Sequence, residues 1–158
     1  MSNVLIGVIG VILFIGLALA GALFLGPRFS NSKTDSEAAR LMTAGSQISK
    51  AYELYRLQEG VYPDGDATKY ASADASQRKL LQLKDKGYLK AIPDGGAEGS
   101  TVRPWYIDDN KGAALTLIGA GDGSLKICES ARKQAGFTDG IKDCTATDIA
   151  NNDPCCKA

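Results

Sequence analysis

The chain opens with a long apolar segment and then changes character. From Val4 to Gly26 it runs for 23 residues without a charge, and every Lys, Arg, Asp and Glu lies at Arg28 or beyond. A helix of that length is about 35 Å long, enough to cross the hydrocarbon core of a bilayer. A buried helix of a soluble protein seldom runs so far without a polar face. The pattern predicts that residues 1–27 form a transmembrane helix, or a helix in the apolar core of a filament.

Five glycines and one proline punctuate this apolar segment. They are Gly7, Gly10, Gly16, Gly21, Gly26 and Pro27. In water a glycine inside a helix costs about 1 kcal/mol relative to alanine, whereas between packed helices it lets two backbones approach closely. The glycine spacing is not the G-x-x-x-G dimer motif, so it indicates close packing or local loosening of the helix. Pro27 lacks an amide donor and restricts the residue before it, which predicts a break or kink at this point.

Three interpretations of the apolar segment compete. A cleavable signal peptide fits poorly, because the first three residues (MSN) carry no Lys or Arg and the apolar run is too long. A plain membrane anchor fits, and so does a helix that leaves the membrane and packs in a filament. Arg28 and Lys33 would hold the C-terminal side in the cytoplasm by the positive-inside rule, whereas the cysteines favour export. A basic leader that once preceded Met1 would remove this conflict.

An amphipathic helix pattern follows over residues 35–58. Its apolar residues recur at spacings of three and four, which places them on one helical face. They are Ala38, Leu41, Gly45, Ile48, Tyr52 and Tyr55. We expect this face to pack against a sheet, with a groove for a partner helix as the alternative, and we expect Gly60 to end the helix. If Pro27 kinks the helix without ending it, residues 4 to 58 form one rod of about 80 Å.

The rest of the chain alternates short elements with turn-rich loops. The expected elements are a helix over Ser76–Lys86, strands over Trp105–Ile107 and Ala113–Ile118 joined by a hairpin turn at 108–112, a short helix or strand-to-helix segment over 125–134, and a loop region over 137–158. This order favours an α+β fold in which the C-terminal half of a long, protruding N-terminal helix packs on a small antiparallel sheet. Residues 28–158 would then form a globular head domain.

All four cysteines lie in the last 31 residues: Cys128, Cys144, Cys155 and Cys156. An even, clustered number of cysteines near a chain's C-terminus, combined with a hydrophobic N-terminus, indicates disulfides formed in an oxidising compartment. The Cα atoms of adjacent residues are about 3.8 Å apart, too close for an ordinary disulfide, so each of the first two cysteines is expected to pair with one of the last two. A zinc site with four thiolate ligands is the alternative, although the adjacent pair lacks the gap of zinc knuckles.

Composition argues against several classes of function. The 18 basic and 18 acidic residues cancel, and no basic stripe predicts nucleic-acid binding. The chain has no His, and neither a phosphate-binding glycine loop nor a nucleophile elbow follows a strand. Asp64, Asp66 and Asp108 lie in turns without the pattern of a calcium loop. We therefore expect no enzyme, no cofactor and no metal site.

The order of these parts resembles the type IV pilins, and within them the type IVb group of toxin-coregulated pilin and bundlin. The block at 36–63, SEAARLMTAGSQISKAYELYRLQEGVYP, is similar to the family's Ala- and Ser-rich spine and the loop after it. The block at 115–136, LTLIGAGDGSLKICESARKQAG, is similar to the family's strand followed by a Cys-bearing helix. In that family this Cys pairs with a Cys near the C-terminus and closes a variable surface loop.

The resemblance implies a subunit of an extracellular filament. Hydrophobic helices of many copies would bundle in the filament core, and the heads would face outward for adhesion, cell–cell or conjugative contact. Its partners would be further copies of the chain, membrane lipid before assembly, a prepilin peptidase, the assembly machinery and a receptor of unknown nature. The alternative is a single-span inner-membrane protein with a periplasmic accessory or binding role, including a minor or tip pilin, that does not polymerise.

One departure from the family lies at the N-terminus. The family usually carries a glutamate a few residues from its mature N-terminus, where the carboxylate is thought to meet the N-terminal amine of a neighbour. Here Leu5 occupies the fifth position, alignment on the spine puts Gly7 near the place, and the first acid is Asp35. The absence spares the cost of burying a carboxylate, but hydrophobic packing alone would then have to set the register of the filament.

Overall fold

The computed structural model describes residues 2–96, 104–108, 113–119, 121–150 and 152–157, and over residues 2–5, 23–30 and 76 it describes the backbone alone. Its elements are helix α1 (Ser2–Glu59), helix α2 (Ala75–Asp85), strands β1 (Trp105–Asp108) and β2 (Ala113–Thr116), and helix α3 (Asp122–Gln134). The fold is a mixture of helices and a small two-stranded antiparallel sheet, which confirms the expected α+β class.

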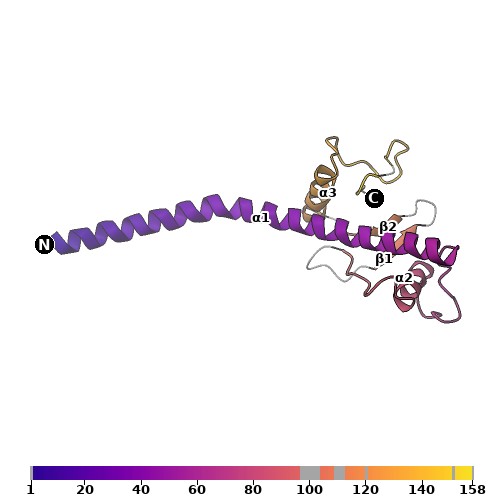
Figure 1. Ribbon diagram of the computed structural model, residues 1–158. Helices are drawn as coiled ribbons and strands as arrows, with labels where there is room; N and C mark the ends of the chain where they lie inside the picture. Colours follow the sequence, from indigo (N-terminus) through magenta and orange to yellow (C-terminus); the bar gives the residue numbers. More distant parts are fainter. Residues whose placement is uncertain (1, 97–103, 109–112, 120, 151, 158) are drawn as a thin grey trace.

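Helix α1 runs without interruption through Gly26 and Pro27, so a break at this point is wrong, and the alternative of one rod over residues 4 to 58 is confirmed. A proline inside a helix removes one i→i−4 hydrogen bond, yet the helical backbone continues on both sides of it. In Figure 1 the N-terminal half of α1 extends away from the rest of the chain, and the N-terminus lies at its far end. The amphipathic segment at 35–58 is therefore the C-terminal part of α1, with no separate helix start at residue 35.

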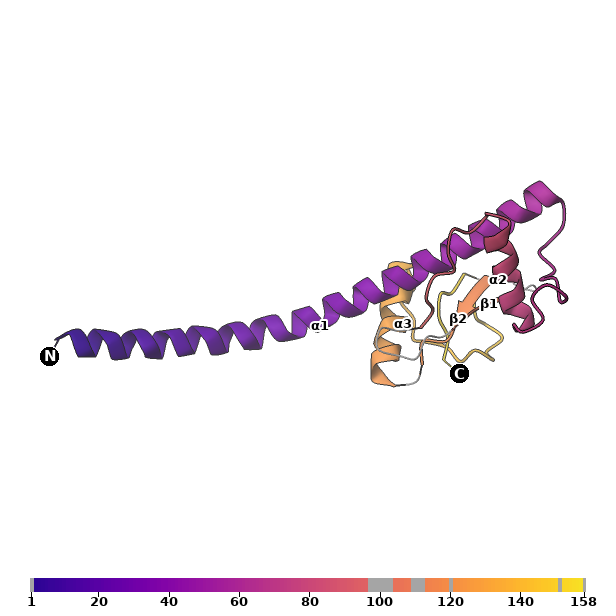
Figure 2. The same cartoon turned by 90° about the horizontal axis from the view of Figure 1, so that it is seen from below.

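The head lies on one side of the C-terminal half of α1. Figure 2 shows α3 near the middle of the long helix and α2 near its C-terminal end, with the two strands between them. Strand β1 pairs with β2 so that Trp105 lies opposite Thr116, and Ile107 lies opposite Ala114. The inward side chains of β1 are buried, and they face the apolar stripe of α1.

The core confirms the expected apolar stripe. Five members of the stripe (Ala38, Leu41, Ile48, Tyr52 and Tyr55) are buried. They pack in one cluster with Trp105 and Ile107 of β1, Leu80 and Leu83 of α2, and Ile127 and Ala131 of α3. An ideal Cβ on Gly45, the sixth member, would lie 3.3 Å from the Trp105 ring, so glycine lets the ring approach the helix. Packing against a sheet and two helices is thus the role of the stripe within the chain.

The short elements follow the sequence pattern closely. The predicted helix at Ser76–Lys86 is α2, and both predicted strands form, although β2 ends at Thr116 instead of Ile118. The segment over 125–134, which the sequence predicts as a short helix or a strand passing into a helix, lies in α3 and is helical along its whole length. Residues 109–112 of the predicted hairpin turn, and with them part of the turn itself, lie outside the described residues. Among the residues that the structure describes, no helix has the combined length and hydropathy of a membrane span.

Candidate assembly interface

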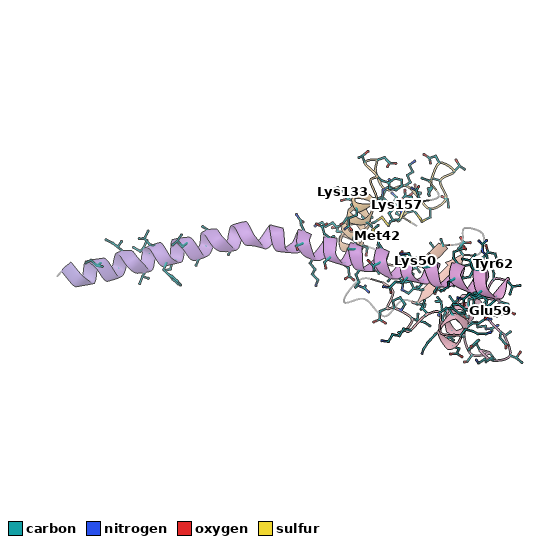
Figure 3. The ribbon with its side chains drawn as sticks, viewed as in Figure 1. Met42, Lys50, Glu59, Tyr62, Lys133 and Lys157 are labelled. Atoms are coloured by element: carbon teal, nitrogen blue, oxygen red, sulfur yellow. A yellow bond between two sulfur atoms is a disulfide. The ribbon has the colours of Figure 1, made fainter. Side chains whose placement is uncertain are left out.

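The described N-terminal side chains of α1, residues 6–22, leave an apolar surface uncovered on every side of the helix. Ten large apolar side chains there are exposed: Ile6, Val8, Ile9, Val11, Ile12, Leu13, Phe14, Ile15, Leu17 and Leu19. Their exposed fractions run from 49% for Ile9 to 74% for Phe14 and Leu17. Figure 3 shows side chains projecting from both sides of this part of the helix, away from the head. We call residues 6–22 the apolar arm.

The glycines of the apolar arm have open space beside them among the described residues. An ideal Cβ built on Gly7, Gly10, Gly16 or Gly21 would have no atom within 4 Å. Each glycine costs a helix about 1 kcal/mol relative to alanine, and no contact among the described residues offsets that cost. Gly26 and Pro27, which the sequence analysis grouped with them, lie where only the backbone is described.

Water is a poor environment for the apolar arm. Soluble monomers rarely expose contiguous apolar patches above a few hundred Å², and larger patches mark sites of protein or membrane contact. Burying a large aliphatic or aromatic side chain is worth about 1.5–3 kcal/mol. Covering ten half-exposed side chains would therefore gain on the order of 10 kcal/mol before the costs of association. Burial of the apolar arm would therefore favour association with other apolar helices or with lipid.

The first acid of the chain is placed in the head. Asp35 Oδ1 accepts a hydrogen bond of 2.6 Å from the hydroxyl of Ser130 on α3. The side-chain amide of Gln134 donates to the backbone carbonyl of Asp35 at 3.1 Å, and to Ser130 Oγ at 3.1 Å. Asp35 thus fastens α3 to α1. The sequence of the apolar arm itself contains no carboxylate.

The C-terminal tail is held by two disulfides. Cys128 on α3 pairs with Cys155, and Cys144 in the tail pairs with Cys156. The disulfide prediction is therefore confirmed, and the four-thiolate zinc site that was its alternative is wrong, because no cysteine is free. The sequence left open which of the two adjacent cysteines each partner would take.

A buried ion pair beside the first disulfide was missed at the sequence level. Arg132 of α3 is 2% exposed and pairs with Asp153 of the tail, whose side chain is 3% exposed. The same guanidinium pairs with Asp139 at 2.6 Å and lies over the ring of Phe137, with 5.1 Å from Cζ to the ring centroid. Arg132 lies one helical turn after Cys128 on α3, but no pattern in the sequence links it to Asp153.

Further apolar side chains are exposed on the head. Leu115 lies on β2, Leu117 follows the end of that strand, and Leu125 lies near the start of α3. A second group, Leu54, Leu57, Val61 and Tyr62, lies at the C-terminal end of α1 and in the loop after it.

In comparisons with protein-family models, with curated proteins and with solved structures, the chain matches none of them. The resemblance to the type IV pilins therefore rests on the residues quoted for it.

Proposed function

We propose that the chain is a structural subunit of an extracellular filament of the type IV pilus kind, held together by its apolar arms. The observation that carries the proposal is the exposure of the apolar arm on every side. A dimer interface needs one apolar stripe on a helix, whereas a helix inside a bundle needs an apolar surface all round. The apolar arm has an apolar surface all round, as a helix inside a bundle needs.

The glycines support the same proposal. Four glycines at separate points of the arm leave space that no described residue of the head or the arm fills. Between packed helices, glycine lets backbones approach closely, so that more of each neighbouring side chain makes contact. Contacts between subunits would then offset the free energy by which these glycines destabilise the helix.

A filament also needs heads that tolerate close neighbours. The stripe on the C-terminal half of α1, the sheet and the two short helices form one core, and the disulfides close the tail. The head is thus a stable unit at one end of a rod, with the tail and loops exposed for contact with other cells or surfaces. Its fold, a long helix with a small antiparallel sheet on its C-terminal half, agrees with the pilin architecture that we propose. Before assembly, we propose that inner-membrane lipid covers the arm.

A second function is favoured by one observation. The arm carries no acid, since the first carboxylate of the chain is Asp35, which bonds to Ser130 in the head. A subunit at the filament tip, or an anchored periplasmic accessory protein that never polymerises, would have no neighbour above it and would need no acid at the family's position.

Mechanical shearing separates these two functions. Cells that produce the chain are sheared, and the released filaments are pelleted, probed for the chain and viewed by electron microscopy. A structural subunit will be a main component of the pelleted filaments, along their length. Its presence in membrane fractions alone would overturn the filament proposal, and its presence at filament tips alone would favour the tip role.

A further inference from the structure

The vicinal cysteines pose a pairing problem that the sequence does not solve. Cys155 and Cys156 are neighbours, yet Cys128 takes the first and Cys144 takes the second. The exchanged pairing would lengthen one closed loop by a residue and shorten the other by a residue. The present loops join cysteines 27 and 12 residues apart. A change of one residue alters the closure probability of such loops by roughly a tenth, so loop entropy does not choose between the pairings.

We propose that the buried ion pair between Arg132 and Asp153 sets the register of the tail and thereby selects Cys155 as the partner of Cys128. The ion pair and the disulfide join the same two segments. Arg132 lies four residues after Cys128 on α3, and Asp153 lies two residues before Cys155 in the tail. With both ends of the ion pair in place, the tail has little freedom to advance by one residue.

Asp153 also orients the cysteine directly. Its Oδ2 atom accepts from Arg132 Nη1, while its Oδ1 atom accepts the backbone N–H of Cys155 at 3.2 Å. One carboxylate therefore connects the guanidinium on α3 to the backbone of the residue that must meet Cys128. A shift of one residue would break both hydrogen bonds and would leave a buried guanidinium without its buried partner, which is strongly unfavourable.

The other contacts of Arg132 hold the guanidinium without choosing a cysteine. Asp139 follows α3 closely and pairs with Nη2 at 2.6 Å, but it lies 14 residues before Asp153 and does not fix the position of the tail end. The backbone carbonyl of Asp139 also accepts from Nη2, at 3.3 Å, while the buried Nε atom has no hydrogen-bond partner among the described residues.

A backbone bridge near the second disulfide is the competing device. Cys144 N–H donates to the carbonyl of Lys157 at 2.8 Å, and Lys157 N–H donates to the carbonyl of Lys142 at 3.0 Å. This bridge is exposed, with side chains of Asp143 and Lys157 that are 64% and 56% exposed. Exposed polar contacts compete with water and contribute little, so we expect the buried ion pair to dominate the choice.

Each pairing step needs a disulfide oxidant, and oxidised glutathione serves. A cysteine thiolate attacks the mixed disulfide between a second cysteine and glutathione. The new cysteine–cysteine bond forms as the cysteine–glutathione bond breaks, and glutathione leaves as its thiolate. Overall, two cysteine thiols lose two protons and two electrons, and one oxidised glutathione becomes two reduced molecules. Exchange between the two pairings then needs only a catalytic thiolate and no net oxidation.

The test is a competition in the full chain with Cys144→Ser, which leaves Cys128 to choose between Cys155 and Cys156. The reduced, unfolded chain is refolded in detergent micelles with reduced and oxidised glutathione. The remaining thiol is then alkylated and located by fragmentation mass spectrometry. We expect pairing with Cys155 to exceed pairing with Cys156 by at least about tenfold, a ratio typical of the loss of a charged hydrogen bond. Oxidation in concentrated guanidinium should give a ratio near one.

Removing the ion pair should remove the preference. With Arg132→Met or Asp153→Asn added, we expect the ratio to fall to about 1–2. With Arg132→Lys, which keeps the charge but lacks the fork that reaches both carboxylates, we expect part of the preference to return. Lys157→Met is the matched control, since it breaks an exposed tail ion pair with Asp143 (3.6 Å) and should leave the ratio unchanged. Asp153→Asn keeps the side-chain volume and serves if Arg132→Met does not fold. A ratio that stays near the parent value in a folded Asp153→Asn chain would overturn the proposal, because a merely structural ion pair alters stability without altering pairing.

Discussion

Gly65 occupies a backbone position that glycine alone fits. Its φ is +68°, and an ideal Cβ would lie 2.9 Å from Arg78 Cβ and 3.0 Å from the backbone nitrogen of Lys79. Its N–H donates to Gln82 Oε1 at 2.7 Å, and Gln82 in turn donates to the Tyr55 hydroxyl at 3.0 Å. These hydrogen bonds fix the loop after α1 against α2. The loop can approach α2 this closely only because Gly65 has no side chain.

Gly65→Ala should therefore destabilise the head by more than about 2 kcal/mol, from the left-handed backbone together with the clash. Gly60→Ala is the matched control, because Gly60 has a φ of +76° and open space where its Cβ would lie. The control should lose only about 1 kcal/mol. Guanidinium unfolding of both variants in micelles gives the two values, and equal losses would show that the close approach at Gly65 is unimportant.

A surface network joins Asp85, at the C-terminal end of α2, to Lys69 and Tyr70 in the loop before that helix. The hydroxyl of Tyr70 donates to Asp85 Oδ2 at 2.7 Å, and Lys69 Nζ lies 2.9 Å from the same oxygen. The Tyr70 hydrogen bond, followed by that of Lys69, lowers the pKa of Asp85 below its ordinary 3.8. Asp85, followed by Tyr70, raises the pKa of Lys69 to about 12.

Stability from Asp85 is present above pH 3.8 and is lost as the pH falls through its lower folded pKa. Stability from Lys69 is present below pH 10.5 and is lost as the pH rises through about 12. Asp85→Asn should flatten the fall of melting temperature both below pH 4 and above pH 10. Lys69→Met should flatten it only in part, because the Tyr70 hydrogen bond to Asp85 remains. A variant that keeps the full pH dependence of the parent would contradict this assignment.

At the scale of elements, α3 and the tail depend on the disulfides for their mutual position. The loop-entropy relation gives a stabilisation of about 3.5 kcal/mol for the Cys128–Cys155 link and about 3 kcal/mol for the Cys144–Cys156 link. The first link also fastens the tail to a buried position on α3, since Cys128 is 3% exposed.

The variant Cys128→Ala/Cys155→Ala should therefore lose more stability than Cys144→Ala/Cys156→Ala. Denaturant unfolding of each purified variant, with the remaining disulfide verified by mass, provides the comparison. The reverse order of stability would show that the tail is held mainly by its second link.

The elements were predictable where the sequence repeats a period. The stripe of α1 from Ala38 to Tyr55 and the leucines of α2 show helical spacing, and Trp105 begins a strand with alternating burial. At Pro27 the sequence left a break and one continuous rod open, and the continuous helix α1 excludes the break. The pairing of Arg132 with Asp153 was not predictable, because 21 residues without a periodic pattern separate the two.

At the scale of the whole molecule, the chain is a head with an uncovered apolar arm. A charge placed on the arm should block assembly without harming the head. Ile12→Glu puts a carboxylate on a surface that is to be buried among apolar helices, where an unpaired charge is very costly. Ser32→Glu is the control, since Ser32 is exposed on the same helix outside the arm.

We expect Ile12→Glu to reduce filament yield by at least about tenfold, whereas Ser32→Glu should leave the yield near the parent level. The filament pellet from sheared cells, quantified against total chain, gives the yield, and near-UV circular dichroism verifies the head. Normal filaments from a folded Ile12→Glu chain would show that the arm does not line the filament core.

Photocrosslinking from Phe14 tests the central claim most directly. Phe14 is 74% exposed in the single chain, and its replacement by benzoylphenylalanine places a reactive ketone at the middle of the arm. After irradiation of intact cells and of sheared filaments, the account predicts a ladder of covalent multimers, with the crosslink mapped to residues 4–26 of a second copy. Irradiated material that contains only monomer and lipid adducts would contradict the account.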